Sequence, residues 1–212
     1  MTWGSTRQAE ASQVPQREEL RRRMSPSTPR LPDAGFQSAG DHRDMSLRFL
    51  DHAQRELDRG RRLQASEKAW GAVAHQLTAI AIDRGWNYGT HYGFTQMAEY
   101  LRQETDNPDI ATLFQAAEAA HGNFYQNHHG PEFIQDSINN SKVLVSMLED
   151  IRQNTPAPVT IRTRAEQGRV KALTGGFHAI GETGVFIGHN RLRSRQERYA
   201  RAVRTPSSED DD

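Results

Sequence analysis

The stretch from about Leu63 to Asp83 is the longest uninterrupted helical pattern in this sequence. Apolar side chains recur there at steps of three and four residues, which places them on one face of a helix. That face consists of Ala69, Trp70, Val73, Leu77, Ile80 and Ala81. The two glycines and the aromatic pair of residues 84–89 predict a turn packed on the core at its end. We therefore expect a fold organised around residues 63–83.

Four further segments show the same periodicity. The first is predicted to begin at Asp44 or Ser46 and to end at Arg59, before Gly60. The others are expected at about 90–104, from 109 to a break near 128–130, and at about 131–151. Short links and the lack of strand-like alternation predict an all-α fold, an antiparallel helical bundle of about five helices.

The two ends of the chain differ from this bundle. Residues 1–43 hold four prolines among polar side chains, with too few apolar ones to offset the entropy of ordering. Residues 153–212 are rich first in Gly and then in Arg, and we predict no stable strand there. We expect a disordered arm over 1–43, a bundle over 44–152 and a low-order tail over 153–212. A mean hydropathy of −0.83 agrees with one moderate domain and loose ends.

Charge is balanced in total but not along the chain. Residues 45–151 hold nine basic and fourteen acidic side chains, whereas residues 152–205 hold eleven basic and three acidic ones. The absence of cysteine excludes disulfides and thiolate metal ligands. No apolar run approaches the roughly 20 residues of a membrane-spanning helix, and the polar start lacks the apolar segment of a secretory signal. We expect a cytoplasmic protein with no membrane partner, metal or cofactor.

Three stretches together suggest a family. Residues 64–75 (QASEKAWGAVAH), then 84–86 (RGW) and 121–125 (HGNFY), resemble the PaREP1 group within the HEPN-like helical superfamily. The resemblance covers about Met45 to Ile151, and ASEKAWG at 65–71 is its most specific part. It implies a prokaryotic up-and-down helical bundle, often dimeric in the wider superfamily. Many of its relatives are metal-independent ribonucleases of toxin or defence systems, and others are non-catalytic RNA- or nucleotide-associated modules.

Catalytic members of that superfamily use an Arg and a His separated by four to six residues. The imidazole can transfer a proton while the guanidinium holds the phosphate. The corresponding region here, residues 121–128, has two histidines and no arginine. Arg84 and His91 do have the spacing and are the catalytic candidates, although they flank a glycine-containing turn. The alternative is that Arg84 caps the second helix and His91 starts the third.

Two groups of residues are candidates for ligand binding. Imidazole and amide side chains at one end of a bundle can contact phosphate or ribose; this group is His121, Asn123, Tyr125 and His128. The adjacent histidines His128 and His129 would point apart on a helix, which argues against a metal site. A second pocket would be shared by Trp70, His75, Trp86 and Tyr88. The alternatives are an ordinary helix-end loop and plain core packing, with Glu67 and Lys68 facing solvent.

The basic tail can contact nucleic acid through phosphates, with Tyr199 available to stack on a base. The arginines predicted to do so are Arg191, Arg193, Arg195 and Arg198. A solvated tail is the alternative reading. The Gly-rich segment before it is not a phosphate loop, because no Gly-Lys-Ser/Thr follows its glycines.

Two functions remain. The first is a non-catalytic binding or interaction module, as a monomer or homodimer, for RNA, a nucleotide or a partner such as a nucleotidyltransferase-like antitoxin. The second is a metal-independent endoribonuclease of a toxin or defence system. The missing Arg-plus-His motif at the expected helix favours the first.

Overall fold

A capping box at Ser38 starts the first helix of the computed structural model, which describes residues 38–126, 128–176 and 183–189. The Ser38 hydroxyl accepts a hydrogen bond from the Asp41 N–H, and the Asp41 carboxylate accepts one from the Ser38 N–H. Helix α2 (Ala39–Asp58) therefore begins before Asp44 and Ser46, the starts predicted from the apolar pattern. The described residues all belong to one unit, Phe36–Asp212.

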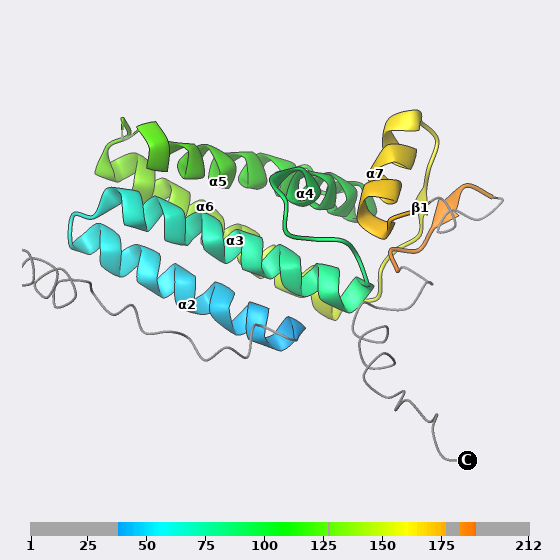
Figure 1. Cartoon of the computed structure of the whole chain (residues 1–212), viewed down its shortest axis with the longest axis horizontal. Coiled ribbons are helices and arrows are strands. Elements are labelled where there is room, and N and C mark those ends of the chain that lie inside the picture. The colour runs from blue at the N-terminus through cyan, green and yellow to red at the C-terminus, as the bar shows by residue number, and fades with distance from the viewer. Residues whose placement is uncertain (1–37, 127, 177–182, 190–212) are drawn as a thin grey trace, which may run out of the picture. The chain divides into compact units, whose positions relative to one another are not determined.

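Helix α3 (Arg62–Arg84) is the central element, as predicted. It packs against α2, α5 and α6 (Figure 1), and 14 of its 23 residues are buried. Its small residues let neighbouring helices approach closely: a Cβ on Gly71 would lie 2.5 Å from Cδ2 of Phe49 on α2. The helix ends at Gly85, whose φ of 68° favours a residue without a Cβ.

Helices α4 (His91–Thr105), α5 (Asp109–Gln126) and α6 (Pro131–Gln153) lie close to their predicted ranges. The Thr90 hydroxyl caps α4 by accepting from the Gly93 N–H, and Pro131 occupies the first turn of α6, where its missing N–H is harmless. Figure 1 shows α2, α3, α5 and α6 alongside one another, with α4 packed on α5. The predicted all-α bundle is confirmed.

The segment after α6 differs from the prediction. It contains a two-residue strand β1 (Val159–Thr160), helix α7 (Arg164–Thr174) and strand β2 (Val185–Phe186), and β1 pairs antiparallel with β2. Its apolar side chains lie in the main core beside Trp86 and Tyr100: they are Val159, Ile161, Val170, Leu173 and Phe186. The Leu173 carbonyl also accepts from the Asn87 N–H at 2.6 Å. Part of the stretch expected to be low in order is thus folded.

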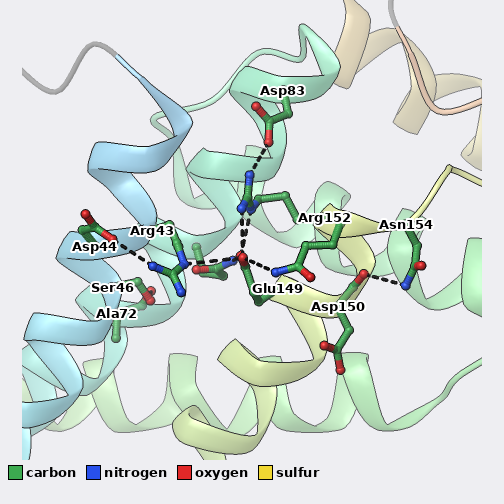
Figure 2. Close-up of polar contacts among 11 residues, drawn as sticks. Arg43, Asp44, Ser46, Ala72, Asp83, Glu149, Asp150, Arg152 and Asn154 are labelled. Atoms are coloured by element: carbon green, nitrogen blue, oxygen red, sulfur yellow. Dashed lines mark hydrogen bonds and ion pairs between the residues drawn. The ribbon is translucent and has the colours of Figure 1, made fainter.

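A polar network around Glu149 ties three helices together (Figure 2). Its carboxylate accepts from Gln76 of α3 at 2.7 Å and from Arg152 at 2.8 Å, and lies 3.4 Å from Nε of Arg43 on α2. Arg152 also donates to Asp83 at 2.8 Å. The hydrogen bonds from Arg152, with those from Gln153 and Gln76, lower the pKa of Glu149 to about 2. Among the helices that the structure describes, none is long and apolar enough to cross a bilayer.

Candidate functional site

Three rings from three helices stack on one another at the junction of α3, α4 and α5. We call Trp70, His91 and His121 the ring stack. The His91 imidazole lies parallel to the Trp70 indole, with ring centroids 5.2 Å apart and planes at 1°. The His121 imidazole lies 5.3 Å from the indole and 5.1 Å from the His91 ring. The indole is only 5% exposed, whereas His91 is exposed, so the stack joins the core to the surface.

Glu67 orients the His121 ring. Its Oε2 lies 2.7 Å from Nδ1 of His121, which places a proton on that nitrogen. Glu67 and Trp70 are three residues apart on α3 and therefore share one face of the helix. Glu67, predicted to face solvent, is thus part of this site.

Two of the three stretches that carry the family resemblance meet at this place. Glu67 and Trp70 of the first stretch contact His121 of the second, and Ser66 accepts a long hydrogen bond, 3.5 Å, from Asn123. Their spacing along the chain does not reveal these contacts, because α3 and α5 are separated by α4 and its turn.

Arg84 lies in the core rather than at a phosphate site. Its two terminal nitrogens donate to both carboxylate oxygens of Glu104 at 2.7 and 2.8 Å, and the two side chains are 3% and 4% exposed. The guanidinium also lies over the Trp86 ring. This geometry gives no support to the predicted catalytic pair, since Arg84 neutralises Glu104 while His91 belongs to the ring stack. The prediction that His91 starts the third helix is confirmed.

The model of the archaeal PaREP1/PaREP8 family matches residues 41–145, a range that includes all three rings and Glu67. The chain belongs to this family. The matched range ends within α6, so α7 and the strand pair lie beyond the PaREP1/PaREP8 region.

Comparison with solved structures finds a crystal structure of a Sulfolobus solfataricus protein. It aligns with a TM-score of 0.46 and 16% sequence identity, covering 50% of this chain and 94% of that chain. A likeness at this level identifies neither fold nor function. Comparison with curated proteins gives no match.

The predicted histidine and amide group of this PaREP1/PaREP8 protein divides into two parts. His121 faces the ring stack, but Asn123 is 1% exposed and holds the loop before α6. Its Oδ1 accepts from the N–H groups of His128 and His129 at 3.1 and 3.0 Å. The His128 side chain is exposed, and the side chain of Tyr125 lies outside the described residues. Asn123 therefore acts as a tether for the loop.

The predicted pocket of Trp70, His75, Trp86 and Tyr88 is also divided by its ring contacts. His75 pairs with His42 of α2, with 2.9 Å between the two Nδ1 atoms, and Tyr88 lies edge-on to His42. Trp86 is 2% exposed and packs against Tyr100. Burial lowers the pKa of His75 to about 4 and also lowers that of His42. His42 falls in the segment assigned to the N-terminal arm, so sequence reasoning missed it.

A cavity of about 260 Å³ lies where α3 and α6 end. Its charged lining residues pair within the protein, because Asp83 faces Arg152 and Arg84 faces Glu104. The described parts of the chain contain no group of three or more His, Asp or Glu side chains arranged to hold a metal ion. The arginines Arg191, Arg193, Arg195 and Arg198 lie outside the described residues, and their contact with nucleic acid stays a prediction.

Proposed function

We propose that this PaREP1/PaREP8 family member is a non-catalytic binding module for RNA, and that bases of the RNA stack on the surface end of the ring stack. The observation that carries this proposal is the exposed His91 ring held parallel to the buried Trp70 indole. Tyr92, next to it, is 64% exposed. Aromatic and imidazole rings bind unpaired bases by stacking, at about 1–3 kcal/mol for each base.

Two further features support a nucleic-acid or nucleotide ligand. His91 and Tyr92 occupy the first turn of α4, where the positive end of the helix dipole favours a phosphate. Phe94 and Phe114 also pack edge-on against Trp70, which holds the indole in place before any ligand binds. The resemblance to RNA-associated HEPN-like modules agrees with this ligand class.

Binding of a labelled, unstructured RNA, followed by fluorescence anisotropy, tests the proposal. Replacing His91 with Ala should weaken binding about tenfold, which corresponds to the loss of about 1.4 kcal/mol of stacking. His52→Ala is the matched control, because His52 is exposed on α2 away from the stack. Unchanged affinity in both His91→Ala and Tyr92→Ala would rule out base binding at this site.

A specific observation favours a second candidate, a metal-independent ribonuclease. Two imidazoles lie 5.1 Å apart and one of them is oriented by a carboxylate. One imidazole could take the 2′-OH proton as the 2′-oxygen attacks phosphorus, and the other could protonate the departing 5′-oxygen. The products would be a 2′,3′-cyclic phosphate and a 5′-hydroxyl.

Incubating RNA with the protein in EDTA distinguishes the two functions. If the protein cleaves RNA, and the cleavage disappears in His91→Ala and in His121→Ala, the protein is a ribonuclease and the binding-module proposal is wrong. Intact RNA that remains bound supports the binding module. A homodimer, a nucleotidyltransferase-like partner and a cytoplasmic location stay predictions from sequence, and light scattering tests the first against the 24.0 kDa monomer mass.

A further inference from the structure

Helix α7 has one basic face turned away from the core. Its buried side chains are Val170, Leu173 and Thr174. Exposed residues follow the complementary helical spacing of three, four and seven. With Arg162 just before the helix, we call them the α7 basic face: Arg162, Arg164, Gln167, Gly168 and Lys171.

Positive charge is concentrated at this element. Over residues 154–176 the sequence holds four cations and a single carboxylate, Glu166. The Glu166 carboxylate is used by the helix cap, where it accepts from the N–H groups of Arg162 and Thr163 at 2.6 and 2.8 Å. Those hydrogen bonds also lower the pKa of Glu166. Residues 45–151 are net acidic, so a polyanion is attracted to α7 rather than to the bundle as a whole.

Gly168 lies in the middle of this face. A Cβ added there would meet no atom within 4 Å, so packing does not require a glycine. Glycine inside a helix is destabilising relative to alanine. Because Gly168 has no side chain, nothing projects from the helix at that position, between Arg164 and Lys171. The backbone of a ligand can therefore approach the helix closely there.

Helix α4 connects helix α7, through residues outside its basic face, to the ring stack. It begins at His91 and, twelve residues later, Gln103 hydrogen-bonds to Glu166 and Arg169 of α7. That separation is about 18 Å along the helix axis, at 1.5 Å per residue. A mononucleotide is too short to contact both places, whereas an RNA strand of several nucleotides is long enough.

We propose that the α7 basic face binds the sugar–phosphate backbone of the RNA whose bases contact the ring stack. This inference rests on the proposed function and deepens it, because it makes the ligand a polymer. The cations of α7 neutralise phosphates without reading sequence, and the ring stack contacts the bases.

The test compares an unstructured RNA with AMP as a mononucleotide probe, each at several salt concentrations. Arg162→Gln/Arg164→Gln should weaken RNA binding about tenfold and leave AMP binding unchanged. The slope of log affinity against log salt should become shallower by about 0.7 for each phosphate that the variant no longer neutralises. Arg48→Gln/Arg55→Gln removes the same charge from exposed positions of α2 and should leave the slope unchanged.

Gly168→Glu is a second variant, because it adds a carboxylate where there is open space and does not disturb packing. It should weaken RNA binding, and Gly168→Ala should not. The inference is overturned if the double arginine variant and Gly168→Glu both bind RNA with wild-type affinity and with the wild-type slope of log affinity against log salt. So would an effect confined to anionic lipid vesicles, or a wild-type protein that binds no RNA.

The two proposals fail in different ways. If only the ring-stack proposal is wrong, His91→Ala keeps wild-type RNA affinity while the arginine variant loses it. If only the α7 inference is wrong, His91→Ala loses binding to both AMP and RNA while the arginine variant binds both normally.

Discussion

Arg84 illustrates how one residue can have the spacing of a catalytic group and a structural role. A buried charge is tolerated when it is paired and hydrogen-bonded, and the bidentate contact with Glu104 meets both conditions. Sequence spacing shows only that Arg84 and His91 are near each other along the chain. It does not show that Glu104, on the next helix, is the partner of the guanidinium.

Replacing Arg84 with Met should lower the free energy of unfolding by about 3–5 kcal/mol, because it leaves the Glu104 carboxylate buried without its cation. Arg102→Met is the control. Arg102 pairs with Glu99, but its side chain is 41% exposed, so its loss should cost less than about 1 kcal/mol. Urea unfolding measures both, and equal costs would contradict the structural role of Arg84.

Asn123→Ala should destabilise the protein by about 1–3 kcal/mol, since the N–H groups of His128 and His129 lose their acceptor. Asn123→Asp keeps the acceptor oxygen and should be closer to wild type. Thermal unfolding compares the two variants. If Asp were as damaging as Ala, the loop would not depend on this acceptor.

The residues of the ring stack were named from the sequence but placed in three different candidate groups. Trp70 was assigned to one pocket, His121 to another and His91 to a catalytic pair. Helical spacing predicts which face of its own helix a residue occupies, and it carries no information on the ring that lies opposite. Glu67 is predicted to face solvent for the same reason, because its partner His121 comes from another helix. His42 is missed because it falls in the segment assigned to the N-terminal arm.

The contact between α2 and α3 depends on a glycine. Gly71→Ala should destabilise the protein by about 1–3 kcal/mol, because its methyl group would overlap the Phe49 ring. Gly122→Ala on α5 is the matched control. No atom lies within 4 Å of its added Cβ, so the helix should gain up to about 1 kcal/mol. Stabilisation of both variants in urea would contradict the close approach of α2.

The same two helices should separate more easily in acid. The usual pKa of a histidine is 6.5, and that of His75 is lowered to about 4. Burial is the largest cause, and the charges of His42 and Lys68 lower it further. Burial also lowers the pKa of His42, against the attraction of Asp41. Between pH 6.5 and about 4 the unfolded chain therefore binds more protons than the folded one, and stability falls as pH falls.

Urea midpoints measured across that pH range test this dependence. His75→Leu should flatten the curve, whereas His52→Leu, at an exposed position of α2, should leave it unchanged. Glu149 contributes little to the pH dependence of stability in this range. Its pKa is lowered to about 2, so the stability that its ionised carboxylate provides is lost mainly at more acid pH. A curve unaffected by His75→Leu would show that the pair is not responsible.

The helices that could be predicted are those with a long apolar stripe and clear caps. Thr90 and Pro131 mark the starts of α4 and α6, and both were recognised. Helix α7 was missed because its apolar residues are few and follow a Pro-rich link. Val170 and Leu173 are buried only as part of the main core, which also holds Trp86 and Tyr100.

Net acidic and net basic segments are separated along the chain. Residues 45–151 carry the ring stack and a net negative charge, whereas residues 152–205, which include α7, are net basic. Raising the salt concentration should therefore weaken RNA binding through α7 and leave AMP binding at the stack nearly unchanged.

Photochemical cross-linking tests whether RNA bases contact the ring stack. RNA containing 4-thiouridine would be bound to the protein, irradiated and digested, and the cross-linked peptides identified by mass spectrometry. Base contact at the ring stack predicts cross-links on the start of α4, at His91 or Tyr92, that disappear in the His91→Ala/Tyr92→Ala variant. Cross-links confined to residues 191–204, with none on α4, would contradict it.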